Sequence, residues 1–209
     1  MILLEEISKS YKRKVLNGIN LKVSKGKCVG ILGSNGCGKT TLLGIMAGVI
    51  KCDSGKIFYD GQRIRSKKLF SEYVGYIPQE NPLIEEVSAR DNIKLWYGAK
   101  FDNSIVEKLG INEFVGKRVS ELSGGMKRRV SICIAMMKKP RILILDEPGA
   151  ALDIYGKREV ISYVKEFIRE GGTVIISTHD RDEIEICDEI YLMKGGVLTQ
   201  EGELLADYL

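Results

Sequence analysis

The sequence of 209 residues is poor in histidine, tryptophan and proline, with one His, one Trp and four Pro. Its longest apolar runs, such as Val130–Met137, fall well short of the roughly 18 to 20 residues that span a bilayer, so we expect no membrane crossing. The first residues show no basic segment followed by an apolar stretch and a small-residue cleavage site, and no signal peptide is predicted. We therefore expect a protein that stays in the cytoplasm.

The cysteines exclude two further classes. There are five, an odd number, and none forms a C-x-x-C pair: Cys28, Cys37, Cys52, Cys133 and Cys187. This pattern argues against a disulfide framework and against a zinc site, so reduced thiols are the default. The net charge of +4 is mildly basic and its basic residues are spread out, which does not indicate a nucleic-acid partner.

The chain predicts one α/β domain spanning residues 1–209. Its opening segment has the alternation of antiparallel strands over Ile2–Ile7 and Ile19–Val23, with Asn17 and Gly18 as turn residues between them. From residue 28 the pattern changes to buried apolar strands followed by helical stretches, which predicts a mostly parallel sheet with crossover helices. These strands are expected at Cys28–Leu32, Ile142–Leu145 and Thr173–Ile176.

Between about residues 77 and 139 helical periodicity replaces the strand-like runs. Helices are expected at Val87–Trp96, Ser104–Leu109 and Gly125–Met137, so this stretch predicts an inserted helical subdomain. Near the end, Ile190–Met193 and Val197–Thr199 have the pattern of a strand pair.

A phosphate-binding loop follows the first buried strand. The residues Gly33, Ser34, Asn35, Gly36, Cys37, Gly38, Lys39 and Thr40 match G-x-x-x-x-G-K-[ST] between a strand and a helix, and Thr41 comes next. Glycines allow successive N–H groups to point inward around an anion, helped by the positive end of the helix. Lys39 is predicted to reach the β- and γ-phosphates of a nucleoside triphosphate, and the Thr40 hydroxyl to bind Mg²⁺.

Two carboxylates end the strand Ile142–Leu145. Asp146 and Glu147 are expected at the carboxyl edge of the sheet, where α/β folds bind ligands. Asp146 suits the Mg²⁺ shell, and Glu147 suits a general base that polarises the attacking water. A solvated strand end is the alternative.

A second anion site is predicted where Leu122, Ser123, Gly124 and Gly125 begin a helix with a serine cap. Together with other motifs it resembles the nucleotide-binding subunit of the ATP-binding cassette (ABC) family. The motifs that carry this resemblance are, in chain order, the phosphate loop, Tyr76-Ile77-Pro78-Gln79, Leu122-Ser123-Gly124-Gly125, Asp146-Glu147, Ala151-Leu152-Asp153 and Thr178-His179-Asp180.

The resemblance implies an Mg²⁺-dependent ATPase that forms a head-to-tail homodimer or heterodimer around two ATP molecules. Ser123, Gly124 and Gly125 would contact the γ-phosphate of ATP held by the partner. Gln79 would sense the γ-phosphate, the water and Mg²⁺, and His179 would hold the γ-phosphate from the far side.

The resemblance also assigns an adenine-stacking role to Tyr11, for which a tyrosine packed on the sheet is the alternative. Asp153 matches the family's pattern. Ala150 stands where serine is common, and what this does to contacts across the dimer stays open.

The resemblance further implies a separate transmembrane permease, which would hold this subunit at the cytoplasmic face of the membrane. Met126-Lys127-Arg128-Arg129 looks like exporter subunits for drugs, peptides or lipids, or is a solvated helix face. A soluble ATPase with an assembly role, such as iron–sulfur cluster assembly, is the alternative. The cargo, the direction of transport and the identity of the permease stay open.

Cys37 lies inside the phosphate loop, beside Lys39 and a helix N-terminus, and both influences favour its thiolate. We expect it to be the most reactive thiol, protected by Mg²⁺–ATP, whereas a buried strand cysteine such as Cys28 is inert.

Overall fold

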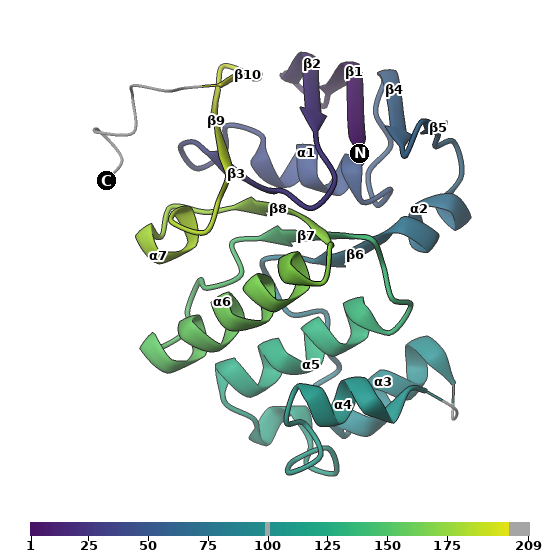
Figure 1. Ribbon diagram of the computed structural model, residues 1–209, viewed down its shortest axis with the longest axis vertical. Helices are drawn as coiled ribbons and strands as arrows, with labels where there is room; N and C mark the ends of the chain where they lie inside the picture. The colour runs from purple at the N-terminus through teal and green to yellow at the C-terminus, as the bar shows by residue number, and fades with distance from the viewer. Residues whose placement is uncertain (99–100, 201–209) are drawn as a thin grey trace.

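The computed structural model describes residues 1–98 and 101–200, and Figure 1 shows two sheets with helices on either side of the larger one. The smaller sheet is antiparallel and contains, in spatial order, β2 (Lys14–Val23), β1 (Ile2–Ser10), β4 (Ser54–Tyr59) and β5 (Gln62–Arg63). The larger sheet contains, in spatial order, β10 (Val197–Gln200), β9 (Glu189–Lys194), β3 (Cys28–Leu32), β8 (Thr173–Ser177), β7 (Ile142–Asp146) and β6 (Val74–Ile77).

The larger sheet is parallel except for its edge strand β10, which pairs antiparallel with β9. The helices are α1 (Lys39–Met46), α2 (Lys67–Tyr73), α3 (Ala89–Tyr97), α4 (Asn103–Lys108), α5 (Gly124–Met136), α6 (Ile154–Arg169) and α7 (Arg181–Ile184), with a short 3₁₀ turn at Val119–Glu121. The predicted α/β fold, with an antiparallel amino-terminal sheet and a mostly parallel second sheet, is confirmed.

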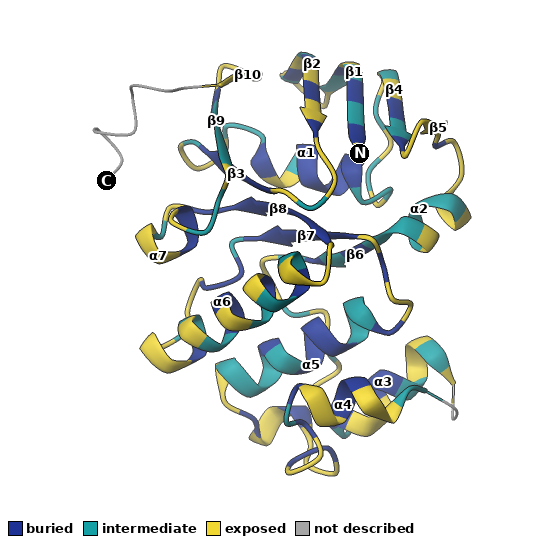
Figure 2. Cartoon of the chain, in the orientation of Figure 1, coloured by how far each residue is buried: buried dark blue, intermediate teal, exposed yellow. Residues whose placement is uncertain are grey.

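The central strands are apolar along their whole length because both of their faces are buried. Along β7, Leu143 and Leu145 face a core shared with α5 and α6, whereas Ile142 and Ile144 face a core shared with α1 and the smaller sheet. Figure 2 shows the corresponding dark band across the middle of the molecule. The carboxyl ends of β3, β7 and β8 are thereby fixed side by side.

The described elements between β6 and β7 are all helical, and α3, α4 and α5 gather at one end of the molecule (Figure 1). The predicted helices at Val87–Trp96, Ser104–Leu109 and Gly125–Met137 correspond to these three. The division of the domain at residues 77 and 139 stays an interpretation.

The turn expected at Asn17 and Gly18 is wrong. The chain reverses at residues 11–13, and both residues lie inside β2. Ile7 pairs with Ile19 and Lys9 with Leu16, so two residues of β2 face one residue of β1, which is a β-bulge. Gly18 has φ +65° and donates its N–H to Ser8 Oγ at 2.9 Å. The glycine therefore supplies a left-handed backbone to a bulge rather than to a hairpin turn.

Candidate nucleotide-binding and catalytic site

The phosphate loop connects β3 to α1 at the carboxyl edge of the larger sheet. Gly38 precedes the first residue of α1 and has φ +118°. A Cβ at Gly38 would lie 3.2 Å from both Val15 and Leu16, so the loop is closely packed on β2 as well as left-handed. This close packing fixes the position of the start of α1 and therefore the direction of its first N–H groups.

A cleft of about 410 Å³ opens over this loop and brings together half of the predicted nucleotide ligands with Gln79 and Glu147. It is lined by Tyr11, Val15, Asn35, Gly36, Gly38, Lys39, Thr40, Thr41, Gln79 and Glu147. The Tyr11 side is open, since this residue is 59% exposed, and Lys9 Nζ lies 5.3 Å from the centre of its ring. An exposed aromatic face at the rim of a cleft is a stacking surface for a planar base.

Lys39 is held inside the loop. It is only 6% exposed, and its ammonium donates to Gly33 O at 2.8 Å and lies 3.6 Å from Glu147 Oε1. A buried cation with carbonyl and carboxylate partners offers a preformed positive centre for phosphate oxygens.

Three side chains converge on the Glu147 carboxylate. Besides Lys39, Gln79 donates from Nε2 to Oε2 at 3.2 Å, and His179 Nδ1 lies 4.0 Å from Oε1. Gln79 follows β6 and His179 follows β8, so they reach Glu147 from the ends of two different strands. The parallel sheet therefore assembles residues that lie about 30 to 70 positions from Glu147 in the chain.

The backbone of Glu147 is strained and firmly held. Its φ is +44°, a left-handed value that costs a residue with a side chain of the order of 1 kcal/mol or more. Its N–H donates to Ser177 O at 3.0 Å and to Ser177 Oγ at 3.1 Å. Strain of this kind persists where the surroundings over-determine the conformation, and it is common at catalytic residues.

Asp146 carries the feature that tests the site for a metal ion. It is 1% exposed, and Ser177 Oγ donates to its Oδ1 at 2.5 Å. Its Oδ2 is buried and has no hydrogen-bond partner among the described residues. An unpartnered buried carboxylate oxygen beside a phosphate loop fits a hard cation such as Mg²⁺, which takes few protein ligands plus phosphate oxygens and water.

Some predicted ligands point elsewhere. Gly33, Ser34 and Cys37 do not line the cleft, and a Cβ added at Gly33 would lie 2.8 Å from Cys37 Sγ. The half-buried Cys37 thiol packs against the apolar core below the loop. The Cys37 N–H donates to Ser34 O at 3.2 Å within the loop.

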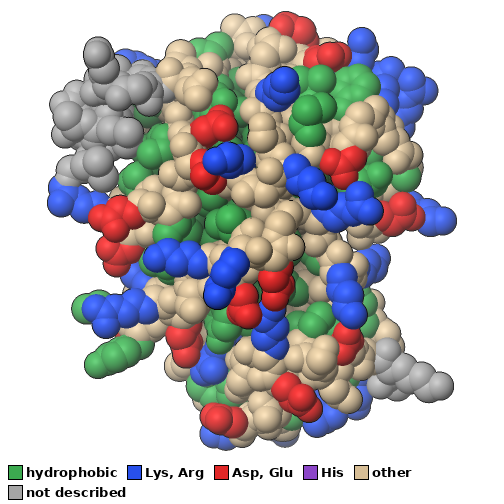
Figure 3. Space-filling model, viewed as in Figure 1, with side chains coloured by type: hydrophobic (Ala, Val, Ile, Leu, Met, Phe, Trp, Pro, Cys, Tyr) green, Lys and Arg blue, Asp and Glu red, His purple; other side chains and the backbone are tan. Residues whose placement is uncertain are grey.

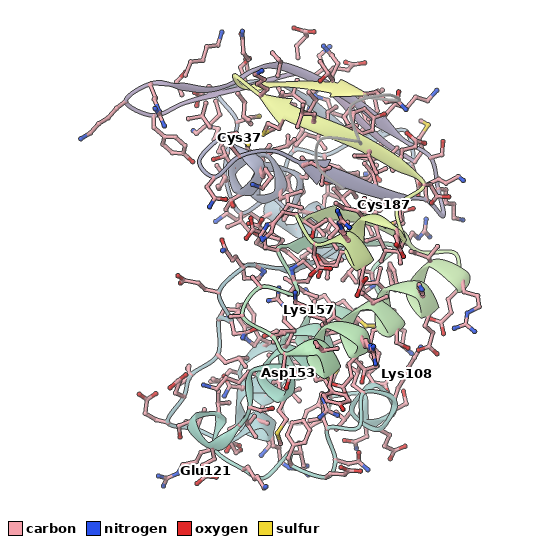
Figure 4. All side chains as sticks on the ribbon, turned by 90° about the vertical axis from the view of Figure 1, so that its left-hand side faces the viewer. Cys37, Lys108, Glu121, Asp153, Lys157 and Cys187 are labelled. Carbon is pink, nitrogen blue, oxygen red and sulfur yellow. The ribbon has the colours of Figure 1, made fainter. Side chains whose placement is uncertain are left out.

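Ser123, Gly124 and Gly125 line a separate hollow of about 320 Å³. Ser123 caps α5, with Oγ accepting from the Met126 N–H at 3.3 Å. Asp153 lies in the same hollow and caps α6, with Oδ1 accepting from the Gly156 N–H at 2.7 Å. Figure 4 shows Asp153 in the lower half of the molecule and Cys37 in the upper half. The structure thus joins Asp153 to the second helix start and not to the phosphate loop of the same chain.

Sequence reasoning missed Arg128. The solvated helix face considered for residues 126–129 is wrong at this position, because Arg128 is 2% exposed. Its guanidinium donates to backbone carbonyls beside Gln79 and Glu147. Burial lowers the pKa of the Arg128 guanidinium to about 10, which still leaves it charged near neutral pH. Arg128 is the middle of three consecutive basic residues, Lys127 to Arg129, and nothing in that run distinguishes it as the buried one.

The fold and the cleft define a nucleotide-binding α/β ATPase with a phosphate loop. A family model described as ABC transporter matches residues 16–150. The chain belongs to the ABC transporter family, as an ATP-binding cassette subunit that hydrolyses ATP for transport. No helix in the described ranges has both the length and the apolar character needed to cross a membrane.

Relatives named for resistance, for export and for import are similar over nearly the whole chain. The linearmycin resistance ATP-binding protein LnrL of Bacillus subtilis is 34% identical, over 99% of this chain and 68% of its own length. The Nod factor export ATP-binding protein I of Rhizobium etli is 33% identical, over 94% of this chain and 66% of its own. The probable sulfate/thiosulfate import ATP-binding protein CysA of Chlorella vulgaris is 33% identical, over 96% of this chain and 90% of its own length.

The cassette MJ0796, solved as a post-hydrolysis dimer bound to ADP and Pi, is similar in three dimensions. Its TM-score is 0.83 at 25% identity, and the match covers 96% of this chain and 98% of that chain.

Proposed function

We propose that this ATPase uses Glu147 as general base, Lys39 as phosphate ligand, and Gln79 and His179 as groups that position water and the γ-phosphate. The observation that carries the proposal is the convergence of Lys39, Gln79 and His179 on one carboxylate at the edge of the sheet. Glu147 is the carboxylate on which the other three side chains converge, and a carboxylate at this place can take the proton of the attacking water. Tyr11 would stack on the base.

Mg²⁺ would be held by Asp146, Thr40 and Gln79, and it would neutralise charge on the β- and γ-phosphates. The unpartnered Asp146 Oδ2 supports this assignment. Ser177 orients the carboxylate from its other oxygen. One serine therefore aligns the proposed metal ligand and, through the Glu147 N–H, the proposed base.

The subunit would act as a head-to-tail dimer in which Ser123, Gly124 and Gly125 complete the cleft of the partner. The separation of their hollow from the cleft of the same chain supports this arrangement. The solved dimer of MJ0796 supports dimerisation of a cassette of this fold. Asp153, beside Ser123, would contribute to the same interface.

The cassette would drive a transmembrane permease that exports a drug, peptide or lipid. The resistance and export relatives support this direction, and the import relative at similar identity supports the opposite one. Affinity purification of the tagged subunit from native membranes, followed by mass spectrometry, tests the partner. A multi-span protein in stoichiometric amount is expected, and a soluble scaffold protein in its place would favour the assembly role.

The catalytic assignment is tested by Glu147→Gln. We expect ATP binding to persist while hydrolysis slows about 10²- to 10⁴-fold, the usual contribution of a general base. The protein should accumulate as an ATP-bound dimer in size-exclusion chromatography with Mg²⁺–ATP. Glu166→Gln is the matched control, because Glu166 lies on α6 and pairs with Lys108. An unchanged steady-state rate in Glu147→Gln would remove Glu147 from the role.

A further inference from the structure

Arg128 connects α5 to the catalytic segment through the backbone. It lies five positions after Ser123, and its guanidinium reaches two segments of chain, residues 78–81 and residues 146–148. The guanidinium donates five hydrogen bonds. Nε donates to Pro148 O at 2.9 Å, Nη1 to Pro78 O at 2.7 Å and to Asn81 Oδ1 at 3.5 Å, and Nη2 to Glu147 O at 3.3 Å and to Asp146 O at 3.4 Å. Four of these five acceptors are main-chain carbonyls.

Packing alone does not explain why a charged side chain such as Arg128 is buried. Removing a charge from water is unfavourable unless hydrogen bonds and opposite charges compensate it. Here the carbonyls use the donors, and the carboxylates of Asp146 and Glu183 supply the opposite charge. The planar guanidinium can donate in several fixed directions at once, which neither an apolar side chain nor a lysine can do.

The acceptors are the peptide groups that aim the proposed catalytic side chains. Pro78 is the residue before Gln79, and its carbonyl belongs to the peptide group that carries the Gln79 N–H. The Glu147 carbonyl is held by Arg128, while the Glu147 N–H is held by Ser177. The left-handed conformation of Glu147 is thus clamped on both sides, from α5 and from β8.

We propose that Arg128 is a positioning residue that fixes Glu147 and Gln79 relative to α5, the helix whose start carries Ser123. The inference rests on the proposed role of Glu147 as general base. It gives α5 two functions in one dimer: Ser123, Gly124 and Gly125 at its start face the partner's ATP, and Arg128 holds the catalytic carboxylate of its own chain. A shift of α5 is transmitted to Glu147 by hydrogen bonds and not by packing alone.

The test compares Arg128→Met, Arg128→Gln and Arg128→Lys. The Met variant keeps an apolar stem without donors, the Gln variant keeps two donors, and the Lys variant keeps the charge. We expect kcat to fall about 10- to 100-fold, as for a small misplacement of a catalytic group, with KM for ATP within about twofold. The Gln variant should lose least, because its amide still reaches backbone acceptors.

Lys127→Met is the matched control, since Lys127 is the adjacent residue of α5. Its ammonium lies 2.7 Å from Glu85 Oε1, and this ion pair does not involve the catalytic segment. We expect its kcat to equal that of the wild type. Thermal unfolding of each variant identifies a protein that has lost its fold, and the Gln variant decides the question if the Met variant does not fold. A folded Arg128→Gln or Arg128→Met protein with wild-type kcat overturns the inference.

The same substitutions in a Glu147→Gln background separate positioning from general damage. If Arg128 acts by positioning Glu147, its loss should lower the residual rate clearly less than about 10-fold, with the remaining effect exerted through Gln79, because coupled residues are not additive. An undiminished 10- to 100-fold loss in that background would overturn the inference. Wild-type hydrolysis by Glu147→Gln alone would instead overturn the proposed function, and the inference with it.

Discussion

The cleft over the phosphate loop and the hollow at Ser123 both begin at helix N-termini, yet they are built differently. The cleft gathers charged groups that already contact one another, with Lys39 3.6 Å from Glu147. The hollow presents a serine and two glycines. Of its two carboxylates, Asp153 caps α6 and Glu159 pairs with Arg129 at 3.5 Å. One surface therefore holds reactive groups, and the other offers backbone N–H groups to an anion.

The difference indicates that the cleft and the hollow suit different tasks, acid–base chemistry in the cleft and anion recognition in the hollow. Acid–base chemistry needs side chains fixed to strand ends, where the sheet sets their spacing. Recognition of a phosphate by a second subunit needs only a helix start free to approach it. In Figure 3 charges of both signs are interspersed over the visible face, so no single-sign field dominates that side. That the chain does not bind nucleic acid stays a prediction.

The largest expected change in ATPase activity comes from inactivating the cleft and the hollow in separate variants. Lys39→Ala removes the cation of the cleft, and Ser123→Arg blocks the hollow. Each protein alone has no intact composite site and should be nearly inactive. After mixing, half of the dimers should be mixed and each should hold one intact site, restoring about a quarter of wild-type ATPase activity for a head-to-tail interface. Additive, parent-like activity at every ratio would indicate that each monomer carries a complete site.

A smaller effect is expected from the metal ligand. Asp146→Asn keeps an acceptor for the Ser177 hydroxyl but removes the negative charge next to the unpartnered oxygen. The Mg²⁺ concentration for half-maximal hydrolysis should rise about 10- to 100-fold, a range typical of weakened metal sites. Titration of Mg²⁺ from an EDTA-treated sample measures it. An unchanged midpoint would take Asp146 out of the metal shell.

Removing the ring at the rim of the cleft should matter less. Tyr11→Ala is expected to weaken ATP binding about 2- to 12-fold, the effect of roughly 0.5 to 1.5 kcal/mol of aromatic stacking. Tyr11→Phe should bind normally, because it keeps the stacking face. Equal losses in both variants would point to the hydroxyl and against stacking. Fluorescence titration with a nucleotide analogue gives both affinities.

The smallest effect concerns the thiol of the loop. Brief maleimide labelling should modify Cys37, and Mg²⁺–ATP should slow that labelling by closing the loop around phosphate. Cys28 and Cys133 are buried, so Cys52 and Cys187 are its competitors. Peptide mapping with and without nucleotide measures each site. Labelling chiefly of Cys52 or Cys187, or equal labelling of Cys37 with saturating ATP, would contradict the expectation.

The sequence alone predicts those strands and motifs whose signal lies in neighbouring residues. The strands β3, β7 and β8 were predicted because a strand buried on both faces is a continuous apolar run. The Asn17–Gly18 pair was misassigned, because a left-handed glycine serves a bulge as well as a hairpin turn. The cleft's main residues were found from motifs, since spacing fixes their place at strand ends.

The remainder depends on contacts that are distant along the chain. Arg128 is buried only because Pro78, 50 residues away, and Pro148, 20 residues away, present carbonyls to it. Asp153 was predicted to bind nucleotide from its motif alone, while its place beside Ser123 follows from the packing of α6 against α5. No local pattern distinguishes these arrangements from a solvated charge or from a second ligand of the same cleft.

The hydrogen bond from Lys39 to Gly33 O has a consequence for how an anion enters. The ammonium has three N–H donors, and the Gly33 carbonyl uses one of them inside the loop. That bond fixes the direction of the remaining donors, so an arriving phosphate oxygen meets a cation that is already in place. Binding therefore immobilises little further side-chain freedom, which favours affinity in the same way as any preorganised ligand site.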